Sequence, residues 1–224
     1  MIKNISNLGD AAVYCDFVIE VNRNINSEVI KYFKAIKEKN IEGINNLTPS
    51  YNKLIISFDL SITNYNKVKD QIEKLDINEI QNNSNKKLEI PVCCDTSFSL
   101  DIKRLEKKLD LSKEKILENF FNKEYFCYMT GFIAGMPFLG DLDQNMRAQR
   151  LETPRVKVPK GSVGLTEQFT NIYTFESPGG WNIIGNTPLD VFDSTKEKDP
   201  NLINPGDTVI FKPITLDQYK NYNE

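Results

Sequence analysis

Glycine and proline divide the second half of the chain into short apolar runs. From Tyr125 onward these two residue types recur every few positions, and no apolar repeat with helical spacing survives. Short runs of this kind are typical of a compact β-barrel with functional loops. The last clear strand is predicted over 208–212 and ends at Pro213. The dividing residues are Pro137, Gly140, Pro154, Pro159, Gly161, Gly164, Pro178, Gly179, Gly180, Gly185, Pro188, Pro205 and Gly206.

The first ninety residues instead alternate between strand and helix patterns. Apolar residues recur at helical spacing in two stretches, and β-branched runs lie before, between and after them. This βαβαβ order indicates a small α/β sandwich. The predicted elements are strands 11–21, 53–59 and 88–94, a helix capped by Ser27 that ends near Lys39, a loop over 40–50, and a helix capped by Asn64.

Two more helices are predicted between these regions. One covers residues 102–109 and the next is capped by Ser112. We place the domain boundary near residue 90, which gives an N-terminal α/β domain over residues 1–90 and a β-barrel domain over residues 91–224. The predicted fold class is therefore α+β.

The residue types present limit the chemistry. The chain has no histidine, which excludes Ser-His-Asp and Cys-His arrangements and histidine zinc sites. Its four cysteines form no C-x-x-C pair, so we interpret them as buried small hydrophobes and expect no metal site. Catalysis by this chain must use carboxylates, Lys, Arg, Tyr, Ser or backbone amides. The cysteines are Cys15, Cys93, Cys94 and Cys127.

Charge and hydropathy exclude several classes of partner. The net charge of -3 gives no electrostatic case for nucleic acid or an anionic membrane. No apolar run reaches the roughly 18 residues of a membrane-spanning helix. The N-terminus lacks the apolar segment of a secretion signal, so we expect a cytoplasmic protein.

Two segments of the second half contain candidate binding residues. Arg155 and Lys157 alternate in an extended stretch, which predicts that both lie on one face and hold a carboxylate or phosphate; a solvated strand face is the alternative. The turn SPGGW, residues 177–181, precedes the only tryptophan. Trp181 can anchor a partner or line a pocket, and a core position is equally compatible with the sequence.

Common nucleotide and nucleophile motifs are absent. Ser162 lies in GSVG rather than in G-x-S-x-G, and the chain contains neither a Walker A motif nor G-x-G-x-x-G. The sequence therefore offers no recognisable motif for binding ATP and identifies no catalytic residue.

An ordered series of motifs carries a resemblance to a known family. The chain contains GFIAGMPFLGDLD, PRVKVPKGSVGLTEQFTNIYTFESPGGWNIIGNTP, VFD and LINPGDTVIF, in that order. This series resembles the allophanate hydrolase subunit 1 family, also described as carboxyltransferase subdomains C and D. The family includes the B subunit of bacterial 5-oxoprolinase and a bacterial inhibitor of a sporulation kinase.

The resemblance implies a cyclophilin-like β-barrel in the C-terminal half and an ATP-dependent complex that converts 5-oxoproline, a cyclic amide, to glutamate. It implies two partners, a protein like the C subunit of 5-oxoprolinase, which shares the active site, and a protein like the A subunit. Alternatives within the family are a regulatory protein that inhibits a histidine kinase and a component related to urea carboxylase or allophanate hydrolase. The residues implied to line the shared site are Arg155, Lys157, Gly161, Ser162, Tyr173, Pro178, Gly179, Gly180 and Trp181.

The chain departs from the family pattern at several positions, some of them within these same loops. These substitutions predict either a changed substrate or a divergent binding subunit. In this chain Ala134 and Thr174 replace family prolines, and Phe120 lies near the place of a family histidine. The other replacements are Met136 in place of phenylalanine, Lys160 in place of alanine, Phe169 in place of glutamine, Asn171 in place of glycine and Asn186 in place of arginine.

Overall fold

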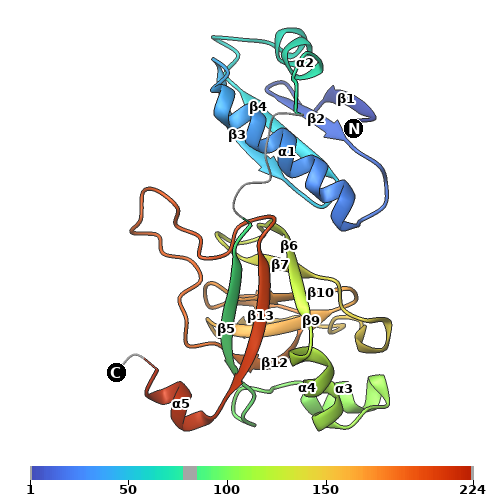
Figure 1. The fold of residues 1–224 in the computed structure, drawn as a ribbon, viewed down its shortest axis with the longest axis vertical. Helices are drawn as coiled ribbons and strands as arrows, with labels where there is room; N and C mark the ends of the chain where they lie inside the picture. The colour runs from blue at the N-terminus through green and yellow to red at the C-terminus, as the bar shows by residue number, and fades with distance from the viewer. Residues whose placement is uncertain (1, 78–84, 223–224) are drawn as a thin grey trace. The chain divides into compact units, whose positions relative to one another are not determined.

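The structure is a computed structural model, and it describes residues 2–77 and 85–222. The chain divides into two compact units near residue 85. The first unit is a four-stranded antiparallel sheet with the strand order β1-β2-β4-β3 and two helices (Figure 1). Its elements are β1 (Asn4–Asn7), β2 (Ala12–Asp16), α1 (Arg23–Lys39), β3 (Ile44–Pro49), β4 (Lys53–Phe58) and α2 (Tyr65–Glu73).

The sheet of the first unit buries one face. Alternate residues of β2 and β4 are buried, as expected for strands with one side in a core. Val29 and Ile36 of α1 and Val68 and Ile72 of α2 belong to the same apolar cluster as those strand residues. Both helices therefore pack on one face, and the α/β sandwich predicted from the sequence is correct.

The predicted element order of this unit was wrong. The observed order is ββαββα, because the strand predicted over 88–94 belongs to the barrel and the predicted loop 40–50 contains β3. Both missed strands, β1 and β3, are sheet edges with exposed polar residues, so their sequences lack the alternation of a half-buried strand.

Helix caps were predicted correctly at two of three places. Asn64 caps α2, and Ser112 caps α4 (Lys113–Phe121). The cap of helix α1 is Asn22, five residues earlier than the predicted Ser27 cap. The Asn22 side chain accepts a hydrogen bond from the Ile25 amide at 3.0 Å, so Ser27 lies inside the helix.

The second unit is a closed barrel with the strand order β10-β7-β6-β13-β5-β12-β9. Strand β10 pairs with both β7 and β9 and so closes the barrel. A separate two-stranded sheet joins β8 and β11. The elements of this unit are β5 (Lys87–Cys93), α3 (Ile102–Leu109), α4, β6 (Glu124–Thr130), β7 (Pro137–Gly140), the 3-10 helix η1 (Gln144–Met146), β8 (Arg155–Val158), β9 (Ser162–Thr166), β10 (Phe169–Ile172), β11 (Ser177–Gly179), β12 (Asn182–Asn186), β13 (Thr208–Ile214) and α5 (Leu216–Lys220).

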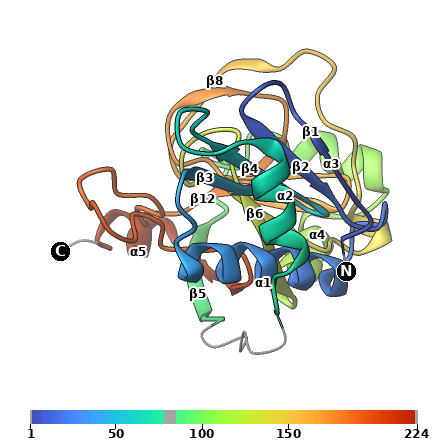
Figure 2. The ribbon, with the colours of Figure 1, turned by 90° about the horizontal axis from the view of Figure 1, so that it is seen from above.

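Apolar side chains fill the barrel and connect it to its helices. Phe120 of α4 stacks on Phe211 of β13 with ring centroids 4.8 Å apart, and both side chains are fully buried. Helices α3 and α4 lie together on one side of the barrel, and α5 lies on the other (Figures 1 and 2). The α+β class with a C-terminal barrel is therefore confirmed.

Two local predictions for this unit were wrong. Helical structure does occur after Tyr125, in η1 and in α5, which is only five residues long and too short to show a period. Strand β13 continues through Pro213 to Ile214. Beyond Ile210 it pairs only with β5, so the missing N–H of Pro213 removes no bond to β6.

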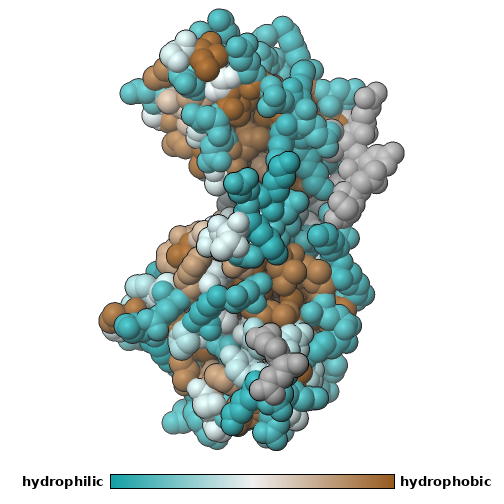
Figure 3. Space-filling view, turned by 90° about the vertical axis from the view of Figure 1, so that its left-hand side faces the viewer, coloured by the Kyte–Doolittle hydropathy of each residue, from teal (hydrophilic) through white to brown (hydrophobic). Residues whose placement is uncertain are grey.

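The surface of the barrel unit exposes several large apolar side chains. Phe132 and Val156 are 76% and 81% exposed, and Phe175 is 42% exposed. Hydrophobic areas also interrupt the hydrophilic surface on the face drawn in Figure 3. Within residues 2–77 and 85–222, no helix has the length and apolar character that crossing a bilayer requires.

Candidate functional site

The predicted site segments meet around Tyr173. In the β8–β11 pair, Arg155 lies opposite Gly179, so the PRVKVPKGS and SPGGW segments are adjacent. The Gly161 amide donates to the Tyr173 carbonyl at 2.8 Å, and the Tyr173 amide donates to the Ser162 carbonyl at 2.9 Å. The two candidate segments and Tyr173 are therefore brought together in the barrel unit.

The Tyr173 side chain occupies the space beneath the SPGGW turn. Its hydroxyl leaves no room for a Cβ at Gly179, which would lie only 2.1 Å away. Burial raises the pKa of Tyr173, and hydrogen bonds with the Trp181 backbone and the Asn171 side chain act in the opposite direction. Because its pKa is above the ordinary value, Tyr173 is a neutral phenol at neutral pH and acts as a donor rather than a base.

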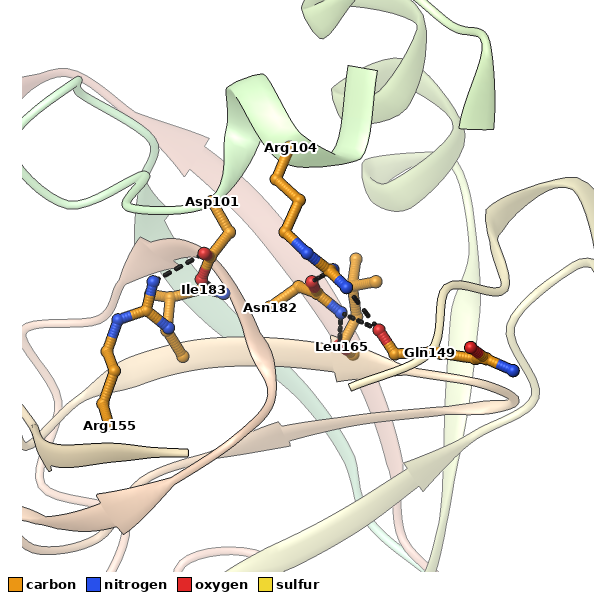
Figure 4. Close-up of polar contacts among 7 residues, drawn as sticks. All are labelled: Asp101, Arg104, Gln149, Arg155, Leu165, Asn182 and Ile183. Atoms are coloured by element: carbon orange, nitrogen blue, oxygen red, sulfur yellow. Dashed lines mark hydrogen bonds and ion pairs between the residues drawn. The ribbon is translucent and has the colours of Figure 1, made fainter. Parts of the chain in front are cut away.

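A buried ion pair holds Arg155. Its Nη2 donates to Asp101 Oδ1 at 2.5 Å, and Asp101 Oδ2 accepts from the Ile183 amide at 2.7 Å (Figure 4). The Asp101 side chain is 5% exposed and that of Arg155 is 27% exposed. Among the described residues, the buried Arg155 Nη1 has no hydrogen-bond partner. Asp101 therefore neutralises this guanidinium and fixes its orientation.

A second contact joins the same helix to the same strand. Arg104 of α3 donates from Nη1 to Asn182 Oδ1 and to the Gln149 carbonyl (Figure 4). The Asn182 amide group donates in turn to the Leu165 carbonyl at 3.0 Å. Asp101, which directly precedes α3, and Arg104 thus anchor this helix to the start of β12, immediately after Trp181.

Sequence reasoning missed Asp101, Arg104 and Asn182. An aspartate directly before a helix is usually an N-cap. Asp101 makes no side-chain cap bond, because its carboxylate points to Arg155 and the Ile183 amide instead. These partners lie 54 and 82 positions away in the chain, so no local pattern marks the contact.

The other predicted site residues have different environments. Lys157 pairs with Glu176 at 2.9 Å at the surface, where the lysine side chain is 74% exposed, so it shares no anion site with Arg155. Gly161 has a φ of +80°, and a Cβ there would lie 2.5 Å from a backbone oxygen. Ser162 is buried in β9 and Pro178 is exposed.

Trp181 is partly buried against the barrel. Its ring meets that of Phe138 edge to face, with centroids 5.6 Å apart. It belongs to a small apolar cluster with Met136, Val158 and Tyr173, whereas the preceding Gly180 is buried. The tryptophan therefore packs over the Tyr173 side chain and helps close this side of the barrel.

Several departures from the family pattern contact one another. Thr174 Oγ1 donates to the Ala134 carbonyl at 2.7 Å, and Asn171 Nδ2 lies 3.7 Å from Met136 Sδ. Asn186 Nδ2 donates to the carbonyl of Lys160 at 2.9 Å, and both residues are departures from the pattern. The substitutions are thus accommodated in pairs, which keeps this region packed.

The cluster around Tyr173 is filled by its own side chains. Two hollows in the described residues are not lined by the predicted site residues. One, of about 300 Å³, lies between α1 and β3; the other, of about 550 Å³, lies over α3. The cluster supplies hydrogen-bond donors, and its carboxylate, Asp101, is already paired, so it offers no general base.

Comparison with known proteins agrees with the fold and the motifs. Residues 3–203 match the model of the carboxyltransferase domain, subdomain C and D. The chain is 33% identical to the 5-oxoprolinase B subunit of Bacillus subtilis (strain 168) over 232 residues, which cover 98% of this chain and 96% of that protein. It is 41% identical to the protein of the same name in Haemophilus influenzae over 124 residues, 55% of this chain and 58% of that protein.

Solved structures share the fold of this chain. The crystal structure of TTHA0988 matches with a TM-score of 0.82 and 27% identity over 92% of this chain, which spans only 40% of that longer chain. The urea carboxylase of Kluyveromyces lactis matches with a TM-score of 0.76 and 20% identity over 97% of this chain and 22% of that protein, a likeness of fold. The family model, the relatives and the barrel agree, and the chain belongs to the family of carboxyltransferase domains, subdomains C and D.

Proposed function

We propose that the chain is the B subunit of a 5-oxoprolinase complex, which opens the cyclic amide 5-oxoproline to glutamate with hydrolysis of ATP. The observation that carries this proposal is the match to the Bacillus subtilis protein over 98% of this chain and 96% of that protein. The match runs through both units, so it involves more than the barrel alone. The likeness to urea carboxylase is 20% in sequence and supports the fold only.

The residues of the cluster support a role that needs partners. Arg155 is neutralised by Asp101, Tyr173 is a neutral phenol, and the chain has no histidine. Nothing in this set removes a proton from water near neutral pH. We propose that proteins like the C and A subunits of 5-oxoprolinase supply the remaining catalytic groups.

The surface beside the cluster suits a partner. Phe132 and Val156 are exposed, and Val156 lies between the two basic residues of β8. Exposed apolar side chains with charged neighbours are typical of protein interfaces. In TTHA0988 the matching region is less than half of a longer chain, as expected for a domain that works beside others.

The proposed chemistry assigns a donor role to this chain. A lactam amide is a poor electrophile, and transfer of the γ-phosphoryl group of ATP to its oxygen, with release of ADP, makes its carbon open to attack by water. The ring nitrogen then takes a proton and leaves as the amine, and a second water hydrolyses the resulting acyl phosphate to glutamate and phosphate. Negative charge then develops on oxygen, where preorganised donors stabilise it. Arg155 and Tyr173 are the donors that this chain offers; Asp101 orients the first, and the second lies beneath the turn over 177–181.

Reconstitution tests the proposal. The chain is mixed with its C-like and A-like partners, ATP and 5-oxoproline, and released glutamate is measured. Glutamate release that falls at least tenfold in Arg155→Met, with Lys198→Met as an exposed control, supports the proposal. A complex that assembles but releases no glutamate contradicts it. Loss of autophosphorylation of a histidine kinase on adding this chain favours the regulatory alternative.

A further inference from the structure

The basic face of α3 has no role in the contacts described so far, apart from Arg104. The helix has the sequence IKRLEKKL, which carries four cations and one acidic residue, in a chain with a net charge of -3. Lys103, Arg104, Lys107 and Lys108 follow the i, i+1, i+4 and i+5 spacing that places residues on one side of a helix. The same four residues line the cavity of about 550 Å³.

Ordinary stabilisation of a helix explains only part of this arrangement. Lys107 and Lys108 lie in the last turn, where the helix dipole favours cations. Lys103 and Arg104 lie in the first turn, where the dipole disfavours them, and that turn contains no acidic residue. The single acid, Glu106, accepts from the Lys113 amide at 3.0 Å and pairs with Lys103 at 3.1 Å.

Among the described residues, three charges of the cluster are therefore uncompensated, because the partners of Arg104 are neutral. In the part of the chain that the structure describes, Lys107 and Lys108 form no ion pair. Arg104 is held by Asn182 and the Gln149 carbonyl, so one cation of the cavity is fixed before any ligand arrives. Cations gathered on one exposed face raise the local positive potential, which attracts an anion of several charges.

We propose that this face of α3 binds a polyphosphate group, either free or as part of a nucleoside triphosphate. The open hollow over α3 has a volume of about 550 Å³, which lies within the range of small-molecule sites. Lysine ammonium groups bind phosphates as point charges, and a guanidinium adds directed donors. Lys103 is already paired with Glu106. A monocarboxylate would compensate one of the three remaining cations, whereas a triphosphate has enough negative charge to compensate all three.

The site is connected to the Tyr173 cluster through α3 itself. Asp101 and Arg104 join this helix to Arg155 and to the start of β12. A ligand on the basic face would therefore contact Arg104, which is hydrogen-bonded to Asn182, the residue after Trp181. The inference does not rest on the proposed 5-oxoprolinase activity, because it concerns binding by the chain without partners.

Calorimetric titration of the full chain tests the proposal. Sodium tripolyphosphate, ATP and AMP are titrated separately into the wild type and into Lys107→Gln/Lys108→Gln. The control is Lys196→Gln/Lys198→Gln, which removes two exposed lysines from a loop outside α3. It changes the net charge by the same amount as the α3 double variant. Thermal melting checks that each variant is folded.

We expect tripolyphosphate and ATP to bind and AMP to bind at least tenfold more weakly. The α3 double variant should lose at least tenfold in affinity, which corresponds to about 1.4 kcal/mol, and the control should change by less than twofold. Binding of ATP without tripolyphosphate, weakened by the same variant, supports a nucleotide as the source of the phosphates. No binding of either ligand, or equal losses in the two double variants, overturns the proposal.

Discussion

Replacement of Asp101 by asparagine tests the buried pair that organises the candidate site. The substitution keeps the shape of the side chain and removes its charge, which leaves the Arg155 guanidinium facing a neutral amide. Asp101 makes two charge-assisted contacts, to Arg155 at 2.5 Å and to the Ile183 amide at 2.7 Å. Such bonds contribute about 1.5 to 3 kcal/mol each in buried positions.

We take the lower value for each contact because the Arg155 side chain is 27% exposed and water weakens the ion pair. The expected loss in the free energy of unfolding is then about 3 kcal/mol, or a fall of roughly 12 °C in the melting temperature of this unit. Urea denaturation followed by Trp181 fluorescence measures it, since the only tryptophan lies in the barrel unit.

A double-mutant cycle separates the pair from other effects. Arg155→Met alone leaves a buried carboxylate without its cation, so the two single losses should exceed the loss in the double variant by at least about 1 kcal/mol. Asp190→Asn is the matched control, because that carboxylate pairs with Lys160 while 68% exposed. A loss below about 1 kcal/mol in Asp101→Asn, or strict additivity in the cycle, refutes the reasoning.

Three further predictions follow from local geometry. Gly179→Ala should lower stability by about 2 to 4 kcal/mol, because a Cβ would lie 2.1 Å from the Tyr173 hydroxyl; Gly180→Ala, whose nearest neighbour is 3.6 Å away, is the control, and equal melting temperatures would contradict the clash. Asn64→Ala should lose about 1 kcal/mol by urea denaturation, since its side chain caps the Lys67 amide at 3.1 Å, and an unchanged midpoint would argue against the cap. Desolvation of the partly buried Cys94 raises its pKa to about 12, so its thiol should react only slowly with a thiol reagent at pH 8. The rate should rise about tenfold per pH unit while the fold persists, and rapid alkylation of the native protein at pH 8 would show that the pKa is not raised.

Local sequence determined much of the fold. The caps Asn64 and Ser112 and the apolar strand β4 are set by neighbouring residues, and each occurs as predicted. Glycine and proline after Tyr125 indicated a barrel because they stop helices and allow tight turns. The edge strands β1 and β3 were missed, since polar edges carry no alternation that a reader of the sequence can use.

The motifs alone indicated which loops form the candidate site, and they also carried the family resemblance that the comparisons confirmed. They could not indicate that Arg155 is neutralised by Asp101 or that Arg104 holds Asn182, because these contacts join residues at least 54 positions apart. Barrel closure brings such residues together only after the strands have paired. The sequence by itself therefore determined the family and the candidate loops, and the tertiary structure decided which charges in them are compensated.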